Sequence, residues 1–148
     1  MPLGLDNPEW RALYEALADL CDETGATHGA VFDEAPIMWC AYNTDEVTPH
    51  DVEISATDVF TREVAPIKAS VRRGARLSVC RSGRDDALYI AESFAGIYVL
   101  ALWFRARFLE ELVRARVRIA LPKIEALTLA LPPPDGPDET SGAGRREA

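Results

Sequence analysis

The sequence has few of the side chains that most often carry chemistry. It contains only two histidines, His28 and His50, and three cysteines, Cys21, Cys40 and Cys80, in 148 residues. The histidines stand apart from each other and from the cysteines, and no two cysteines have the close spacing of a metal or redox motif. This pattern argues against a metal centre. We interpret the cysteines as small buried hydrophobic residues of a protein from a reducing compartment.

Motifs for phosphate binding and nucleophilic catalysis are missing as well. The glycine-containing segment 25–29 precedes a predicted strand instead of a helix, and no segment matches the lysine-bearing loop that holds a nucleotide. The turns at 82–83 and 93–96 do not form the strand-to-helix elbow that exposes a nucleophilic serine. The acidic residues of segment 45–58 lack the alternate spacing and central glycine of a calcium loop. We therefore expect a protein that is not an enzyme, without catalytic residues, cofactor or metal ion.

Long hydrophobic runs and basic patches are absent too. The most apolar segment, 94–104, is far shorter than a membrane span, and the N-terminus has no basic start followed by an apolar stretch. The formal net charge is −8, and no basic stripe is interleaved with aromatic residues. An acidic protein of this kind is not expected to bind nucleic acid or an anionic membrane surface. The sequence predicts a soluble, cytoplasmic protein.

Charge is divided unevenly along the chain. Residues 1–60 carry thirteen acidic side chains and one basic side chain, Arg11, whereas residues 61–131 carry thirteen basic and seven acidic ones. Such a distribution can steer a charged partner or bring two copies together acid to base. It can equally reflect solvated faces that differ. The sequence leaves these alternatives open.

Periodic apolar residues predict eight elements in the order helix, strand, strand, helix, strand, strand, strand, helix. Asn7 and Pro8 open the first helix and Gly25 ends it. The predicted strands cover residues 28–33, 37–42, 76–81, 88–92 and 97–104. The last strand is apolar on both faces, as a central strand covered by helices on each side requires.

Two further helices are predicted, and a connection precedes the first of them. The polar, acidic segment 43–56 is predicted to be a mobile connection. Ser55 with Asp58 resembles a capping box for a second helix that ends near Arg73 and is kinked at Pro66. The third helix covers 107–131, and Pro122 is expected to bend it or to split it in two. Residues 132–148 contain no apolar residue larger than alanine and are predicted to be a disordered tail.

This order predicts one α/β domain over residues 7–131, large enough to bury its own core. We expect a five-stranded, mainly antiparallel sheet in the spatial order 2-1-5-4-3, with the first and third helices on one face and the second helix on the other. A single core is expected where the first and last helices meet the last strand. Its predicted members are Trp10, Leu13, Leu17, Leu20, Val99, Trp103, Leu112, Leu121 and Ile124.

With these elements placed, the chain resembles the roadblock family, relatives of the dynein light chain whose profilin-like scaffold is related to longin and GAF domains. The likeness lies in the element order and in residues 29–33, GAVFD, which lead through a turn to residues 37–40, IMWC. Roadblock proteins are non-catalytic dimers that regulate or scaffold small Ras-like GTPases. The resemblance therefore implies a homodimeric interaction module in a GTPase system.

The resemblance also implies where two copies would meet. In the family the dimer forms through the second helix and the strand after it, which correspond here to residues 57–73 and 76–81. The interface residues expected on this basis are Phe60, Val64, Ile67, Val71, Leu77 and Val79. The implied partners are a second copy, a small GTPase or another roadblock-like protein.

A second hypothesis from the sequence is a GAF-like sensor that holds a small molecule between the sheet and the acidic segment. A sensor needs a sizeable apolar pocket with a few polar groups. A dimerising scaffold should instead have a filled core and an exposed apolar strip on its second helix.

Overall fold

The computed structural model describes residues 7–66, 77–81 and 88–131. Its elements are α1 (Pro8–Thr24), β1 (His28–Asp33), β2 (Met38–Asn43), α2 (Pro49–Val59), the π-helical segment η1 (Phe60–Val64), β3 (Ser78–Arg81), β4 (Tyr89–Phe94), β5 (Tyr98–Trp103) and α4 (Glu110–Leu129). The expected interface residues Ile67 and Val71 and the expected tail, 132–148, lie outside the described residues.

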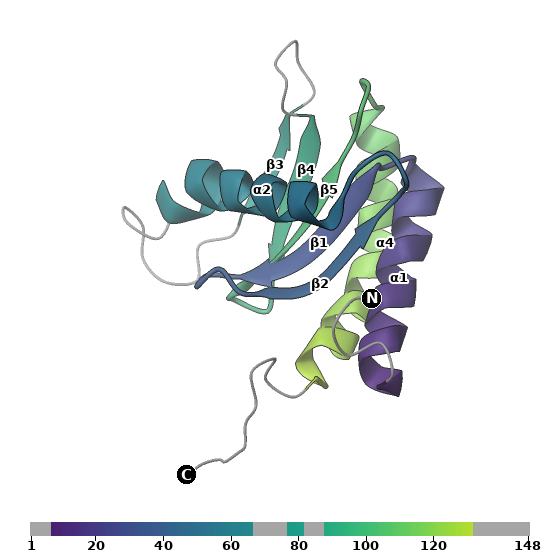
Figure 1. Ribbon diagram of the computed structural model, residues 1–148, viewed down its shortest axis with the longest axis vertical. Helices are drawn as coiled ribbons and strands as arrows, with labels where there is room; N and C mark the ends of the chain where they lie inside the picture. The colour runs from purple at the N-terminus through teal and green to yellow at the C-terminus, as the bar shows by residue number, and fades with distance from the viewer. Residues whose placement is uncertain (1–6, 67–76, 82–87, 132–148) are drawn as a thin grey trace.

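The strands form an antiparallel sheet in the order β2-β1-β5-β4-β3, which confirms the predicted topology. Helices α1 and α4 lie side by side on one face of this sheet, and α2 crosses the other face (Figure 1). The predicted fold class is confirmed with these three layers. Strand β3 closes one edge of the sheet and β2 the other.

The prediction of a single core is wrong, because the buried residues form two clusters, one on each face of the sheet. Successive residues of a strand point to opposite faces, so β5 supplies Leu100 and Leu102 to the α1 and α4 side and Val99 and Trp103 to the α2 side. Leu112, placed in the core from the sequence, is 59% exposed. Apart from Val99 and Trp103, the remaining members of the predicted core are buried or half-buried on the α1 and α4 side.

Two glycines set the path of the chain around α1. Gly25 ends the helix in the left-handed region, at φ 83°, and its amide donates to the carbonyl of Cys21. Gly29 lies under the helix, where a Cβ atom would come within 2.9 Å of Cys21 Sγ and 3.0 Å of Leu102 Cδ2. The absence of a side chain at Gly29 therefore allows α1 to approach the sheet closely.

The segment predicted to be a mobile connection contains most of α2, so that prediction is wrong. Thr48 is the N-cap: its hydroxyl accepts from the amide of Asp51, whose carboxylate accepts from the amide of Thr48. Pro49 occupies the first turn, where its missing N–H costs nothing. The capping box predicted at Ser55 and Asp58 is also wrong, since both residues lie inside the helix.

Prolines act differently in the two later helices. Upstream of Pro66 the chain widens into η1, where the amide of Ala65 donates to the carbonyl of Phe60 five residues back. In a regular α-helix the ring of Pro66 would collide with the carbonyl of Arg62. By contrast, α4 runs through Pro122 as one helix, so the predicted split does not occur. Pro122 is exposed, and buried Val117 and Ile124 hold both halves of α4 against the sheet.

Candidate interaction surface at the β3 edge

Strand β3 forms one edge of the sheet. In the part of the chain that the structure describes, β3 pairs with β4 only, and its other side faces away from the sheet. An edge strand with free N–H and C=O groups can add a further strand from another chain. The geometry around β3 therefore decides which partner this edge can take.

A buried carboxylate joins β3 and β4 to the helical segment above them. Glu63 of η1 is 7% exposed, and it accepts from Arg81 Nε at 2.9 Å and from Arg81 Nη2 at 2.9 Å. The hydroxyl of Tyr89 on β4 donates to the same carboxylate. The hydrogen bonds from Arg81 lower the pKa of Glu63, and burial together with Glu63 raises the pKa of Tyr89 to about 12. Glu63 is therefore ionised at neutral pH, and both donors are protonated.

A second polar cluster holds β3 from the opposite face. Arg114 of α4 donates through Nη1 to Ser78 Oγ at 2.8 Å and to Glu92 Oε2 at 2.8 Å. Ser78 also donates to Glu92 at 3.3 Å, across the β3 and β4 pair. Arg114 and Glu92 are each about a fifth exposed. Strand β3 is therefore held on both faces by charged hydrogen bonds.

The expected interface residues do not share one environment. Val64 and Leu77 are 6% and 5% exposed and belong to the core on the α2 side. Phe60 and Val79 are half-buried and pack against the same core. Among the described residues of the expected set, Phe60 and Val79 therefore have the surface that a partner could cover.

A row of polar and aromatic side chains crosses the sheet beneath α2 and η1. Strand pairing places His28, Trp103, Tyr89 and Arg81 next to one another on β1, β5, β4 and β3. The His28 ring stacks on Trp103 with centroids 4.8 Å apart, and its Nε2 lies 3.1 Å from Ser55 Oγ on α2. Burial lowers the pKa of His28 to about 4, so the imidazole is neutral at pH 7.

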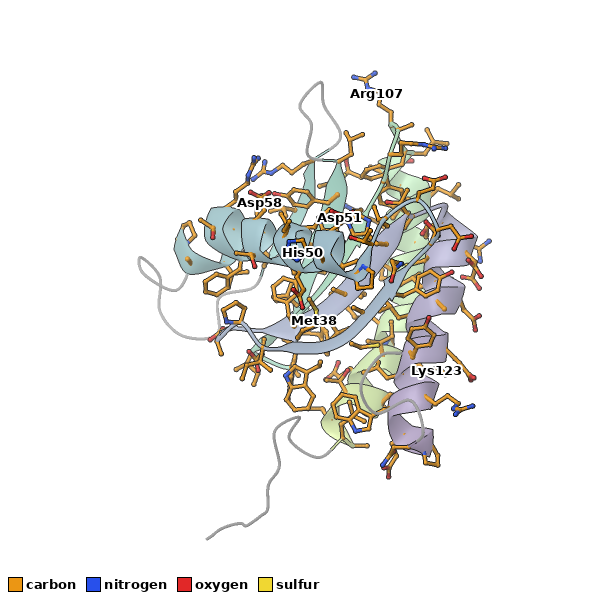
Figure 2. The ribbon with its side chains drawn as sticks, viewed as in Figure 1. Met38, His50, Asp51, Asp58, Arg107 and Lys123 are labelled. Atoms are coloured by element: carbon orange, nitrogen blue, oxygen red, sulfur yellow. The ribbon has the colours of Figure 1, made fainter. Side chains whose placement is uncertain are left out.

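Among the cavities that the described residues form, two at the periphery of the fold bear on function. One of about 360 Å³ lies over this row, between His28 and Trp103 on the sheet and Ser55, Asp58 and Arg62 on the helical segment. Asp58 and Arg62 pair at 3.1 Å at its rim, and Figure 2 shows Asp58 on α2. The other, about 510 Å³, lies between the C-terminal end of α1 and the loop that leads into α4.

Reactive groups are sparse in the described residues. Within 7–66, 77–81 and 88–131, no three His, Cys, Asp or Glu side chains gather closely enough to hold a metal ion. Burial raises the pKa of the Cys21 and Cys40 thiols to about 12, which keeps them protonated and poorly nucleophilic. No helix in the same residues has the length and apolar character of a membrane span.

Comparison with solved structures finds the same architecture. The gliding protein MglB from Thermus thermophilus superposes with a TM-score of 0.68 at 15% identity, over 84% of this chain and 94% of that chain. The chain has the roadblock fold. A structure of MglB with a tetrameric arrangement matches at a TM-score of 0.60 and 13% identity, over 83% of this chain and 92% of that chain.

A roadblock/LC7 domain from Streptomyces avermitilis also matches, with a TM-score of 0.54 and 10% identity, over 79% of this chain and 98% of that chain. No protein-family model matches the sequence, and neither does any curated protein. At these identities the likeness establishes the roadblock fold, and what the chain does must be argued from its own residues.

The sequence places the expected interface on the second helix and the strand after it, but it does not single out the polar residues that hold this strand. Glu63, Arg81 and Tyr89 were not singled out, because they lie on three separate elements and share no spacing in the sequence. One signal was available for Glu63: it is an acidic residue that adjoins the apolar positions of the predicted second helix. Its partners follow only from the strand register.

Proposed function

We propose that this chain is a non-catalytic homodimeric interaction module that regulates or scaffolds a small Ras-like GTPase. Two copies would meet along β3, with η1 beside it. The observation that carries the proposal is that β3 lies at the edge of the sheet in the described residues and is held on both of its faces by Glu63 and Arg114. A strand already fixed in place loses less conformational entropy when it pairs than a mobile one does.

Side chains next to the edge suit a symmetric contact. Val79 pairs with Ala91, which lies in the core on the α2 side, so Val79 and Phe60 flank the edge on that face. Both are half-buried, and a second copy related by a twofold axis would cover them with its own Val79 and Phe60. This contact would also complete the face of the sheet that a single helix covers.

The resemblance to the roadblock family supports the GTPase part of the proposal. Among the structures with this fold is a gliding protein, and one MglB structure has a tetrameric arrangement, so chains of this fold do assemble with one another. The exposed apolar strip expected on the second helix is reduced to Ile54 and half-buried Phe60 in the described residues. Ile54, 55% exposed, is the contact that α2 offers to a GTPase beside the self-association edge.

A small-molecule sensor is the second candidate, and the cavity over Trp103 favours it. Its volume of about 360 Å³ falls within the range of small-molecule sites, roughly 300–1,000 Å³. Its rim, however, is formed by an exposed ion pair, and the described apolar residues that line it are few. We rank the scaffold first on these grounds.

The test uses purified small Ras-like GTPases from the organism that encodes this chain, loaded with GDP or with a non-hydrolysable GTP analogue. Calorimetry should find one that binds with a Kd in the micromolar range or below, and more tightly in one nucleotide state. Ile54→Glu should weaken that binding, while Ile97→Glu, at an exposed but distant position, should not. Failure of every GTPase to bind in either state would contradict the GTPase part of the proposal.

A further inference from the structure

Helix α4 has two apolar faces, and the fold uses only one of them. The inner face contributes buried Val113, Val117 and Ile124 to the core. On the outer face Leu112, Ile119 and Leu129 are 59%, 72% and 56% exposed. We define the outer stripe as Leu112, Ala115, Ile119, Pro122, Ala126 and Leu129. The outer face of a surface helix is normally polar, so this stripe needs an explanation.

The spacing of the outer stripe is that of a coiled coil. Its intervals are three, four, three, four and three residues, which is the alternation of a and d positions in a heptad repeat. The stripe is about 25 Å long at the rise of an α-helix. The positions that would flank such a contact are charged: Arg116 and Lys123 lie on one side, and Glu111, Arg118 and Glu125 on the other. The pattern therefore fits a second helix packed along α4.

We infer that the outer stripe binds the outer stripe of a second copy of this chain in an antiparallel pair. With the twofold axis between Ala120 and Leu121, Leu112 faces Leu129 of the other copy and Ala115 faces Ala126. Near the axis Ile119 faces Pro122. Large residues therefore meet large ones at the ends and small residues meet small ones between them, and all six positions find a partner. Because the outer stripe is complementary to itself, we infer that it binds a second copy of this chain instead of a helix of another protein.

Charge complementarity supports the same arrangement on the flank away from α1. Arg114 shows which flank this is, because it reaches Ser78 on β3 and Glu92 on β4. The residues Arg118 and Glu125 lie on that side of the outer stripe. In the antiparallel pair each Arg118 lies opposite Glu125 of the other copy, which gives two pairs of opposite charge.

Arg116 and Lys123 lie on the other flank of the outer stripe, and the exposed side chains of the neighbouring helix α1 are mostly acidic. Figure 2 shows Lys123 on the side of the molecule where α1 lies. Exposed acids on α1 include Glu15, Asp19 and Glu23. If two copies pack through the side of the sheet that carries α1 and α4, both α1 helices lie next to Arg116 and Lys123 of both copies. The acidic side chains of α1 then offset the repulsion among these four basic side chains. The uneven charge of the sequence then serves to bring two copies together.

The inferred contact is independent of the proposed β3 contact. The outer stripe is on the α1 and α4 side of the sheet and faces away from it, whereas the β3 contact lies at one edge and on the α2 side (Figure 1). Both contacts can be made at once, and we infer the closed form, in which the two twofold axes cross at right angles and four copies form a dimer of dimers.

The test is the mass of the full chain and its variants, measured by light scattering after size exclusion from about 1 to 100 micromolar. The unmodified chain should reach four copies, and Ile119→Glu should stop at two. Ile97→Glu, exposed but outside the outer stripe, is the matched control and should still reach four. Far-UV circular dichroism should show that each variant is folded, as expected at exposed sites. An unchanged mass for Ile119→Glu would overturn the inference.

A second variant separates this inference from the proposed β3 contact. Val79→Glu should also stop at two copies, and the double variant Val79→Glu, Ile119→Glu should be monomeric. If Val79→Glu leaves four copies while Ile119→Glu halves the mass, the β3 contact is wrong and the outer stripe stands. If the unmodified chain stops at two copies and Val79→Glu alone makes it monomeric, the outer stripe is wrong and the β3 contact stands.

Cross-linking tests the antiparallel direction. Leu112→Cys mixed with Leu129→Cys should form a disulfide between the two variants, because antiparallel packing places these positions opposite each other. The unmodified chain, which carries the same native cysteines, is the control. Disulfides formed only between two copies of the same variant would indicate a parallel pair. If a thiol reagent labels the introduced cysteines but no disulfide forms between copies, the outer stripe binds something other than a second copy. Either result would overturn the inference.

Discussion

The two faces of the sheet are held together by different interactions. On the α1 and α4 side, two helices pack side by side over a large apolar cluster, and the polar contacts of Arg114 lie at the end of it near β3. On the α2 side, a smaller apolar cluster is supplemented by polar contacts: His28 meets Ser55, and Glu63 binds Arg81 and Tyr89. A single helix can rock on an apolar surface, whereas hydrogen bonds at two points along it fix its direction. Hydrogen bonds therefore help to position the single helix on the less covered face of the sheet.

Apolar side chains remain half-buried around the clusters on both faces of the sheet. Met38, Ala41, Phe60 and Val79 pack against the cluster on the α2 side without being buried. Figure 2 shows Met38 below α2, on the sheet. On both faces half-buried apolar side chains surround the core, and on the α2 side two of them, Phe60 and Val79, lie next to the β3 edge.

The largest effect is expected from a substitution that creates a cavity on the face of the sheet that α1 and α4 cover. Leu17 is fully buried between α1 and the sheet, so Leu17→Ala should lower the free energy of unfolding by about 2–5 kcal/mol. Ile97→Ala, at an exposed position outside both proposed contacts, is the matched control and should change it by less than about 0.5 kcal/mol. Urea denaturation measures both. Equal losses in the two variants would mean that α1 does not seal this face.

A smaller effect is expected from the polar cluster on the other face. Glu63→Gln removes the charge that Arg81 and Tyr89 share and should cost about 1.5–3 kcal/mol, as for a hydrogen bond to a charged group. Glu92→Gln alters a comparable pair that is less buried and should cost less than about 1 kcal/mol. A larger loss for Glu92→Gln would contradict the assignment of Glu63 as the main polar contact of this face.

The contribution of Glu63 should depend on pH in a defined direction. Arg81 lowers the pKa of Glu63 in the folded state below its ordinary value of 4.5. The stabilisation is therefore present above pH 4.5 and is lost as the pH falls through the folded pKa. The difference in unfolding free energy between the unmodified chain and Glu63→Gln should shrink below about pH 4.5. A difference that grows on acidification would exclude an ionised Glu63.

The smallest effect concerns His28. Burial lowers its folded pKa to about 4 from the ordinary 6.5, so the unfolded chain binds the proton more readily. Stability should therefore fall as the pH drops from about 6.5 to about 4, and His28→Gln should reduce that slope. An NMR titration of the imidazole, assigned with His50→Gln, should give a pKa near 4. A value near 6.5 would place His28 in water and remove its role under α2.

Local signals were sufficient for most of the fold. Apolar periodicity and the caps at Asn7 and Gly25 predict α1 to within one residue, and the alternation in 97–104 predicts a central strand with two covered faces. The same alternation argues for two cores, so the single predicted core failed because Val99 and Trp103 were grouped with residues of the opposite face. The register of the strands shows which residues share a face of the sheet, and this register cannot be read from the sequence alone.

The sequence contains a signal for the beginning of α2, but the prediction did not use it. Thr48, Pro49 and Asp51 form a capping box with proline in the first turn, yet the acidic composition of the segment favoured a loop interpretation. The polar contacts under the helix could not be predicted, because Glu63 meets Arg81 and Tyr89 only after η1 turns its side chain toward the sheet and the strands align. Long-range ion pairs leave no periodic trace in a sequence.

The measurement that tests the account most directly is the self-association of Ile119→Glu with and without Val79→Glu, by sedimentation velocity from about 1 to 100 micromolar. In the Ile119→Glu variant the outer stripe is disrupted, so only the β3 contact can join two copies. We predict a dimer for Ile119→Glu that becomes a folded monomer when Val79→Glu is added. A monomer for Ile119→Glu and for the unmodified chain across the whole range would contradict the claim that the less covered face and its edge are completed by a second copy.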